Sequence, residues 1–274
     1  MLEIPEAAVM ADQLNKTITG KTIQKVVVAQ NPHGFAWYSG EPDSFVQALT
    51  GRSIGTSQSL GGLVEIQTED KFLLFSDGIN LRYHQKSEDQ PMKHQFLMEF
   101  EDHSAVSATV AMYGGISCIL PREYDNPYYL VAIQKPSPLT DAFDAGYFFS
   151  LFLPEMDKLS MKAFLATEQR IPGLGNGVLQ DILFRARLHP KRKVGSLSKP
   201  EKDTLFQSIK TTLNEMTFKG GRDTEKDIFG NPGGYSTMMS KNTVGKPCPQ
   251  CGSVIEKQAY MGGSIYFCPG CQTI

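Results

Sequence analysis

The spacing of apolar residues changes character along the chain. Between Pro5 and Gly20 the apolar positions recur with the period of a helix, with proline at its start and glycine at its end. From about Ile23 to Leu120 the pattern becomes short apolar runs that glycine, aspartate and asparagine interrupt, which is typical of an antiparallel sandwich. The predicted strands include residues 22–29, 63–67, 72–75 and 95–100.

Helical periodicity dominates the second half of the chain. Residues 121–138 are rich in proline and tyrosine and indicate a linker, after which we predict helices over 142–153, 162–168, 177–188 and 199–216. The expected fold class is α+β, with a leading helix on an N-terminal antiparallel β-sandwich, a helical domain and a C-terminal metal ribbon. The expected boundaries are 1–130, 131–240 and 241–274.

Four cysteines near the C-terminus form two pairs, Cys248-Pro-Gln-Cys251 and Cys268-Pro-Gly-Cys271, with sixteen residues between them. This spacing matches a four-thiolate zinc ribbon, in which each pair binds one side of a tetrahedral ion. Gly262-Gly263 lies midway between β-prone residues and suits the turn of the required hairpin. Two disulfides or a redox-active pair are the alternatives. A redox site needs only one pair, so two pairs favour structural Zn²⁺.

Composition and charge indicate the cellular compartment of the protein and the kind of partner that it binds. The chain of 274 residues has 41% apolar content, enough for two modest cores, and it opens without a basic leader or a membrane-spanning run. We therefore expect a cytoplasmic protein without membrane contacts. Between Arg185 and Asp227, eleven Lys and Arg face six Asp and Glu, so this +5 segment sits in a chain of net charge −2. Such a basic helical segment fits a surface that contacts phosphates, although a solvated helical face would look similar.

A glycine-rich turn precedes one predicted helix. Glycines at 173, 175 and 177 allow close backbone approach, and Asn176 could cap the helix, whose free amides favour a phosphate. Such a turn also begins ordinary helices, so by itself it is weak evidence for a phosphate site and the neighbouring motifs must support it. Gly220-Gly221 and the cysteine pairs follow it in order.

Together these segments resemble the formamidopyrimidine-DNA glycosylase / endonuclease VIII family, over nearly the full chain and in the family's order. The resemblance implies a β-sandwich, a helix–two-turn–helix domain and a zinc finger that grip damaged or abasic double-stranded DNA in a cleft. It also implies base excision repair at the bacterial nucleoid, by what we expect to be a monomer. The matching stretches are Glu3–Glu6, Lys162–Leu165, Gly173–Asn176, Leu188–Pro190, Gly220–Gly221 and Tyr266–Gln272.

The resemblance also implies catalytic positions at the N-terminus. In this family an N-terminal proline amine attacks the deoxyribose C1′, and a Schiff base and strand cleavage follow. Here Leu2 takes the place of that proline, whereas Glu3 is in register as general acid/base and Glu6 is present. A bulky second residue blocks methionine removal, so the amine of Met1 would lie up to about 3.6 Å from the family nucleophile. An exposed Leu2 amine could also form a Schiff base.

Two cations of the family are missing. By alignment, Gly62 stands at the site of a lysine in the β domain, and Gly263 stands five residues before Cys268, where the family has an arginine at the hairpin tip. Both cations face phosphates beside the reacting sugar, where fixed positive charge stabilises the transition state.

Other positions are expected to contact DNA. The resemblance gives Asn176 to a phosphate contact beside the lesion, places Lys162 on a helix that faces the same cleft, and matches Lys93 and His94 to a pair near the DNA backbone. Met112-Tyr113 stands where the family fills the gap left by an extruded nucleotide, although Tyr113 could instead be a core residue.

Three functions remain open from the sequence. The first is a DNA glycosylase, with or without AP lyase activity. The second, which the losses at Leu2, Gly62 and Gly263 favour, is a catalytically silent protein that binds damaged DNA. The third is a zinc ribbon used for RNA or protein contacts, which the basic segment argues against. Retention of Glu3 and Glu6 favours the glycosylase, because a pure binder has no evident need for both carboxylates.

Overall fold

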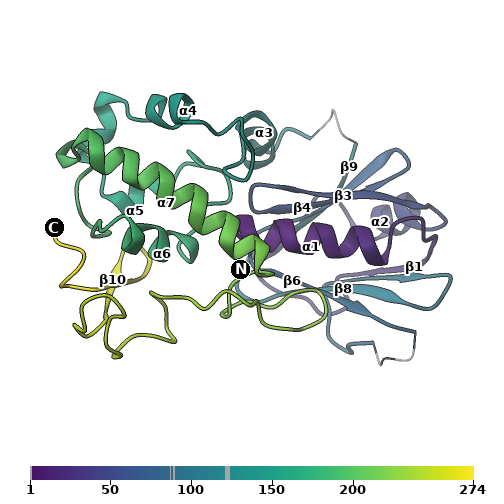
Figure 1. Cartoon of the computed structure of the whole chain (residues 1–274). Helices are drawn as coiled ribbons and strands as arrows, with labels where there is room; N and C mark the ends of the chain where they lie inside the picture. Colours follow the sequence, from purple (N-terminus) through teal and green to yellow (C-terminus); the bar gives the residue numbers. More distant parts are fainter. Residues whose placement is uncertain (1, 87, 89, 121–123) are drawn as a thin grey trace.

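The computed structural model describes residues 2–86, 88, 90–120 and 124–274. Two β-sheets form an N-terminal sandwich, with helix α1 (Ile4–Thr17) beside it (Figure 1). One sheet has the order β2-β9-β5-β4-β3 and the other the order β1-β7-β8-β6. The elements of the sandwich are β1 (Ile23–Val28), β2 (Ala36–Tyr38), α2 (Pro42–Leu49), β3 (Ile54–Leu60), β4 (Leu63–Thr68), β5 (Lys71–Phe75), β6 (Ile79–His84), β7 (Phe96–Phe100), β8 (Ala105–Val110) and β9 (Gly114–Ile119).

The inner faces of both sheets share one apolar core. Phe75 and Phe96, from opposite sheets, are fully buried and meet edge to face, with ring centroids 5.6 Å apart. The prediction of an antiparallel sandwich holds for most of the sheets. Among the described strands, the exception is β2, which pairs in parallel with β9, with Trp37 opposite Gly115.

A helical domain follows the sandwich, as the periodicity predicted. Its apolar core is separate from that of the sandwich and gathers around α6 and the long helix α7. The helices are α3 (Pro127–Gln134), α4 (Ala145–Ser150), the 3-10 turn η1 (Pro154–Lys158), α5 (Met161–Ala166), α6 (Val178–Arg185), the 3-10 turn η2 (Val194–Ser196) and α7 (Lys199–Phe218).

The predicted linker over 121–138 is wrong in part, because α3 lies inside it. The side chain of Asn126 accepts hydrogen bonds from the amides of Tyr128 and Tyr129, and Pro127 occupies the first helical turn. These start signals outweigh the proline and tyrosine content that suggested a linker. Residues 121–123 lie outside the described part of the chain.

Helix α1 belongs to both cores. Its first residue, Ile4, is buried among the helices, whereas Met10 and Leu14 are buried in the sandwich. The backbone before it is fixed on both sides, because the Leu2 amide donates to the Asp77 carbonyl (2.8 Å) and the Ile4 amide donates to the Gly173 carbonyl (3.1 Å). The start of the chain therefore lies where the two domains meet.

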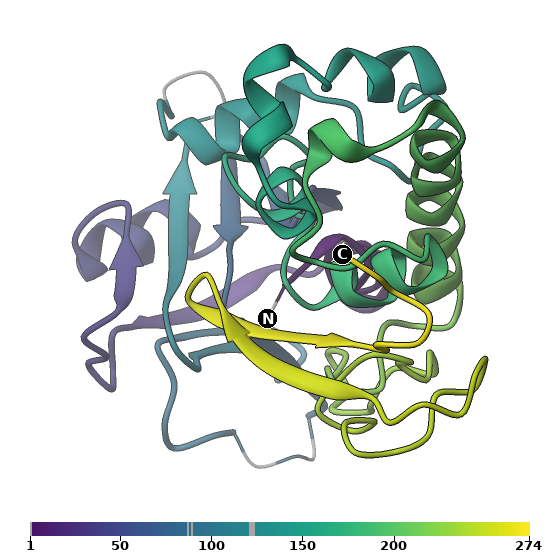
Figure 2. The ribbon, with the colours of Figure 1, turned by 90° about the vertical axis from the view of Figure 1, so that its left-hand side faces the viewer.

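The C-terminal segment forms the predicted hairpin from β10 (Glu256–Tyr260) and β11 (Gly263–Phe267). Tyr260 pairs with Gly263 across a two-residue turn, Met261-Gly262, in which both residues have positive φ (50° and 70°). This is the turn geometry that suits the twist of a hairpin. In Figure 2 the hairpin (yellow) lies on the side of the molecule that faces the viewer. No helix in the described residues is long and apolar enough to cross a membrane.

Candidate active site and metal centre

A cavity of about 800 Å³ opens where the sandwich, the helical domain and the hairpin tip meet. Its lining includes Leu2 and Glu3 from the N-terminus, Lys162 and Asn176 from the helical domain, and Gly263 from the hairpin. The structure thus brings together residues from distant parts of the sequence that we had predicted as catalytic or DNA-binding.

Glu3 caps helix α6 from the other end of the chain. Its two carboxylate oxygens accept from the amides of Gly177 (2.8 Å) and Val178 (2.7 Å), the free amides at the helix start. The prediction that Asn176 caps this helix is wrong, because its side-chain amide donates instead to the Ser264 carbonyl in the hairpin (3.0 Å). Glu3 is therefore held in one orientation by the backbone.

Arg222 is a site residue that the sequence analysis missed. It is buried between two carboxylates: its guanidinium donates to both oxygens of Glu6 (2.9 and 2.8 Å) and lies 3.5 Å from Glu3. The preceding Gly220 and Gly221 adopt positive φ, which turns the chain back toward α1. The Gly-Gly-Arg sequence was the available signal, but a buried pairing with residues over two hundred positions away has no local signature.

The protonation of Glu3 reflects opposing influences. Burial raises its pKa above the ordinary value, and the neighbouring charge of Glu6 adds to this. The charge of Arg222 and the amides of Gly177 and Val178 act in the opposite direction. A carboxyl group with a raised pKa beside a cavity is suited to act as a general acid and base.

Lys162 and Asn176 join the helical domain to the hairpin. The buried Lys162 ammonium donates to the Tyr260 carbonyl (2.6 Å), and burial lowers its pKa. A Cβ placed on Gly263 would lie 3.4 Å from Lys162 Nζ and 3.7 Å from Asn176 Nδ2. The hairpin tip thus meets two polar side chains that we predicted to bind DNA.

The two positions that lack the family's cations, Gly62 and Gly263, differ in the space available for a side chain. At Gly263 an added Cβ would make only ordinary contacts, so the backbone there accommodates a side chain. At Gly62 an added Cβ would lie 3.1 Å from the Leu2 carbonyl oxygen and 3.2 Å from Gly173 Cα. Because both neighbours are backbone atoms, the packing of the N-terminus against this turn favours glycine at position 62.

The remaining predicted residues divide between the cavity rim and other places. Met112 and Tyr113 line the cavity and are 64% and 36% exposed, which places Tyr113 at the rim rather than in the core. Lys93 is exposed, whereas His94 is buried and its Nδ1 lies 2.9 Å from the Pro91 carbonyl; neither lines the cavity. Met1 lies outside the described residues.

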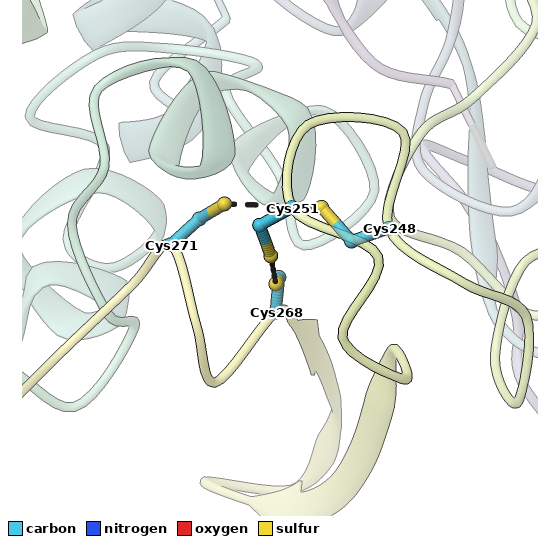
Figure 3. A group of neighbouring side chains, drawn as sticks. All are labelled: Cys248, Cys251, Cys268 and Cys271. Atoms are coloured by element: carbon cyan, nitrogen blue, oxygen red, sulfur yellow. Dashed lines mark hydrogen bonds between the residues drawn. The ribbon is translucent and has the colours of Figure 1, made fainter.

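The four C-terminal cysteines form a compact cluster (Figure 3). Their sulfur atoms all lie within 4.8 Å of one another, with 3.8 Å between Cys248 and Cys271 and 3.3 Å between Cys251 and Cys268. All four are free thiols. Such a set can hold one metal ion. The cluster packs against Phe184 of α6, so it anchors the hairpin to the helical domain.

Comparisons with known proteins agree with this architecture. Residues 1–110 match the formamidopyrimidine-DNA glycosylase N-terminal domain, and residues 135–226 match the formamidopyrimidine-DNA glycosylase H2TH domain. A formamidopyrimidine-DNA glycosylase from Lactobacillus johnsonii is 27% identical over 100% of this chain and 99% of its own. Another, from Hydrogenovibrio crunogenus, is 28% identical over 99% of this chain and 96% of its own.

Solved structures show the same fold. The MutM (Fpg) protein from Thermus thermophilus superposes with a TM-score of 0.82 at 26% identity, covering 98% of each chain. The Lactococcus lactis Fpg in complex with DNA that contains an abasic site gives 0.85 at 23% identity, over 99% of this chain and 100% of that one. A sandwich, a helix–two-turn–helix domain and a cysteine hairpin around one cavity define a class of DNA-repair proteins. The chain belongs to the formamidopyrimidine-DNA glycosylase / endonuclease VIII family.

Proposed function

We propose that this protein binds damaged or abasic sites in duplex DNA and excises damaged bases, with or without AP lyase activity. The observation that best supports this proposal is the fixed position of Glu3, which lines the cavity beside the chain start and is held by the N-terminus of α6. Glu3 also caps α6 and lies 3.5 Å from Arg222, so its use in catalysis is supported by its place beside the chain start and by its raised pKa together.

In this proposal the N-terminal amine is the nucleophile. At an abasic site the amine nitrogen bonds to C1′ of the ring-opened sugar, and water leaves as the imine forms. Glu3 supplies the proton for the departing water and takes protons from the attacking amine. The Leu2 backbone nitrogen, 2.8 Å from the Asp77 carbonyl, fixes the chain start at the cavity. The amine belongs to Met1, or to Leu2 if Met1 is removed.

Phosphate contacts would come from the helical domain and the hairpin. Lys162 and Asn176 face the cavity, and the basic segment from Arg185 to Asp227, apart from the buried Arg222, supplies further cations. We assign the exposed Lys93 to a second contact with the DNA backbone, away from the cavity, as the resemblance predicts, whereas the predicted contact of His94 does not fit its buried side chain. Binding dominated by such contacts weakens steeply with salt, and a flat response to salt would contradict a DNA interface.

We infer that the metal held by the four cysteines is Zn²⁺ in a structural role. With Zn–S bonds of about 2.3 Å, a tetrahedral site has sulfur–sulfur edges of about 3.8 Å. The separation of 3.8 Å between Cys248 and Cys271 fits this, that of 3.3 Å between Cys251 and Cys268 is shorter, and four thiolates are a typical zinc set. The ion would fix the hairpin so that Gly263 stays beside Lys162. We also infer a monomer that acts at the bacterial nucleoid.

The decisive experiment is borohydride trapping on a duplex with one abasic site. We expect a covalent adduct that mass spectrometry maps to the N-terminal residue, and the intact mass shows whether this is Met1 or Leu2. Glu3→Gln should slow adduct formation while leaving binding to a tetrahydrofuran site intact. Tight, salt-sensitive binding without any adduct or base release would contradict the enzymatic function and indicate a silent damage-binding protein.

A further inference from the structure

The cavity wall contains an unusual number of aromatic rings. One tryptophan and five tyrosines are among the described residues that line it, and the exposed rings come from the sandwich (Trp37 and Tyr113) and from α3 (Tyr128). The tryptophan and the tyrosines are Trp37, Tyr38, Tyr113, Tyr124, Tyr128 and Tyr129. Tyr129 is buried and its hydroxyl donates to Glu65 (3.0 Å), so it serves the wall itself. Trp37 instead exposes 55% of its surface, which leaves much of its indole uncovered beside the cavity.

Trp37 stands on a rigid support. It lies in β2, whose parallel pairing with β9 sets Trp37 opposite Gly115. The Gly114 amide donates to the Phe35 carbonyl (3.0 Å), which ties the start of β9 to the same segment. Gly115 has no side chain that could cover the indole. A large apolar ring exposed at a fixed position loses little conformational entropy when a ligand packs on it.

Tyr113 lies next to Trp37 at the rim. The ring centroids are 6.1 Å apart and the rings are inclined at 48°, so the two do not stack face to face. Burial raises the pKa of the Tyr113 hydroxyl, and the negative charges of Asp77 and Glu3 add to the effect. This places the phenol within electrostatic reach of the carboxylate to which we assign proton transfer. The pair therefore extends from the open rim toward the chemical centre.

We propose that Trp37, which lies next to the Tyr113 that we expect to fill the gap in the duplex, is a stacking plate for the extruded base, and so selects duplexes that carry a base over those that are already abasic. The inference rests on the proposed function. Base–aromatic stacking tolerates any base, because every base has a π-face, and an extruded base must be held between apolar or aromatic surfaces. A side chain that stacks on the extruded base contributes no binding energy when the base is missing. A side chain that fills the gap inside the duplex would instead contribute with or without the base.

The test compares two duplexes that differ only at the damaged nucleotide. One carries a formamidopyrimidine base on a carbocyclic sugar that resists cleavage, and the other carries tetrahydrofuran, which has no base. Trp37→Ala should weaken binding of the first duplex roughly 5- to 100-fold and leave binding of the second within about twofold. Trp37→Phe keeps an aromatic plate and should recover most of the loss.

A matched control is available two residues away. Phe35 is 62% exposed on the same segment but does not line the cavity. Phe35→Ala should leave the ratio of the two affinities unchanged. An equal loss on both duplexes for Trp37→Ala would overturn the proposal and make Trp37 a wedge or a backbone contact. Failure of the unaltered protein to bind either duplex would instead overturn the proposed function.

A second readout uses the composition of the chain. Trp37 is its single tryptophan, so intrinsic tryptophan emission reports this position alone. Stacking on a base should quench the emission when the formamidopyrimidine duplex is added, and the tetrahydrofuran duplex should quench it much less at matched saturation. Equal quenching by the two duplexes would contradict contact with the extruded base.

Discussion

Arg222 neutralises two carboxylates in the interior, and its removal should be severely destabilising. Arg222 is 2% exposed, Glu3 is 3% exposed and Glu6 is 4% exposed. Arg222→Met keeps much of the side-chain volume but leaves both carboxylates without their guanidinium. Removing one partner of a buried ion pair costs about 3–5 kcal/mol. Because domains are commonly stable by only about 5–15 kcal/mol, this loss would be a large share of the total.

The magnitude can be measured by urea unfolding followed by circular dichroism. The expected result is a lower midpoint at an unchanged denaturant slope, since the folded state keeps its compactness. In a double-mutant cycle, Glu6→Gln together with Arg222→Met should cost less than the sum of the two single changes. A loss below about 1 kcal/mol for Arg222→Met would refute the assignment of this pair as a main link between α1 and the segment after α7.

The sign of the pH dependence provides a further check on the same cluster. Burial holds the pKa of Glu3 above its ordinary value of 4.5, so the folded state binds more protons than the unfolded state as the pH rises past 4.5. The contribution of Glu3 to stability is therefore most favourable below pH 4.5 and declines as the pH rises toward the folded pKa. Loss of Arg222 should enlarge this decline, because a lowering influence on the Glu3 pKa disappears.

Two other predictions follow from the hairpin and the missing cations. Gly263→Arg should fold normally and steepen the salt dependence of DNA binding by about one phosphate contact, whereas the charge-matched control Thr204→Arg on the exposed side of α7 should leave that dependence unchanged. Gly62→Lys should destabilise the protein, because backbone atoms lie next to position 62. Equal melting temperatures for the variants at 62 and 263 would contradict the packing argument. Cys268→Ser should release the metal in a chelator assay and abolish DNA binding while the sandwich stays folded; normal binding by the metal-free variant would remove the hairpin from the interface.

The sequence predicted those parts of the molecule whose cause is local. The cysteine spacing indicated the hairpin, and the apolar periods indicated the sandwich and the later helices. The Asn126-Pro127 start of α3 was also a local signal, but the proline and tyrosine content around it obscured it. The resemblance then marked Glu3, Lys162 and Asn176, which the structure brings to one cavity.

What the sequence could not provide were pairings between distant segments. The cap on α6 comes from Glu3 rather than from the adjacent Asn176, because the Asn176 side chain donates a hydrogen bond to the hairpin. Arg222 meets Glu6 across 216 positions, and Trp37 reaches the cavity only through the parallel pairing of β2 with β9. Each of these depends on how the domains pack, which no window of neighbouring residues encodes.

The location of the chain start has a practical consequence for handling this protein. Leu2 is buried, lines the cavity and is tied to Asp77, so a peptide fused ahead of it would start at the cavity in which the proposed mechanism places the DNA sugar. Purification tags, fluorescent labels and surface tethers therefore belong at the other end, where Ile274 is 82% exposed. The trapping experiment on abasic DNA therefore needs a protein without an N-terminal tag.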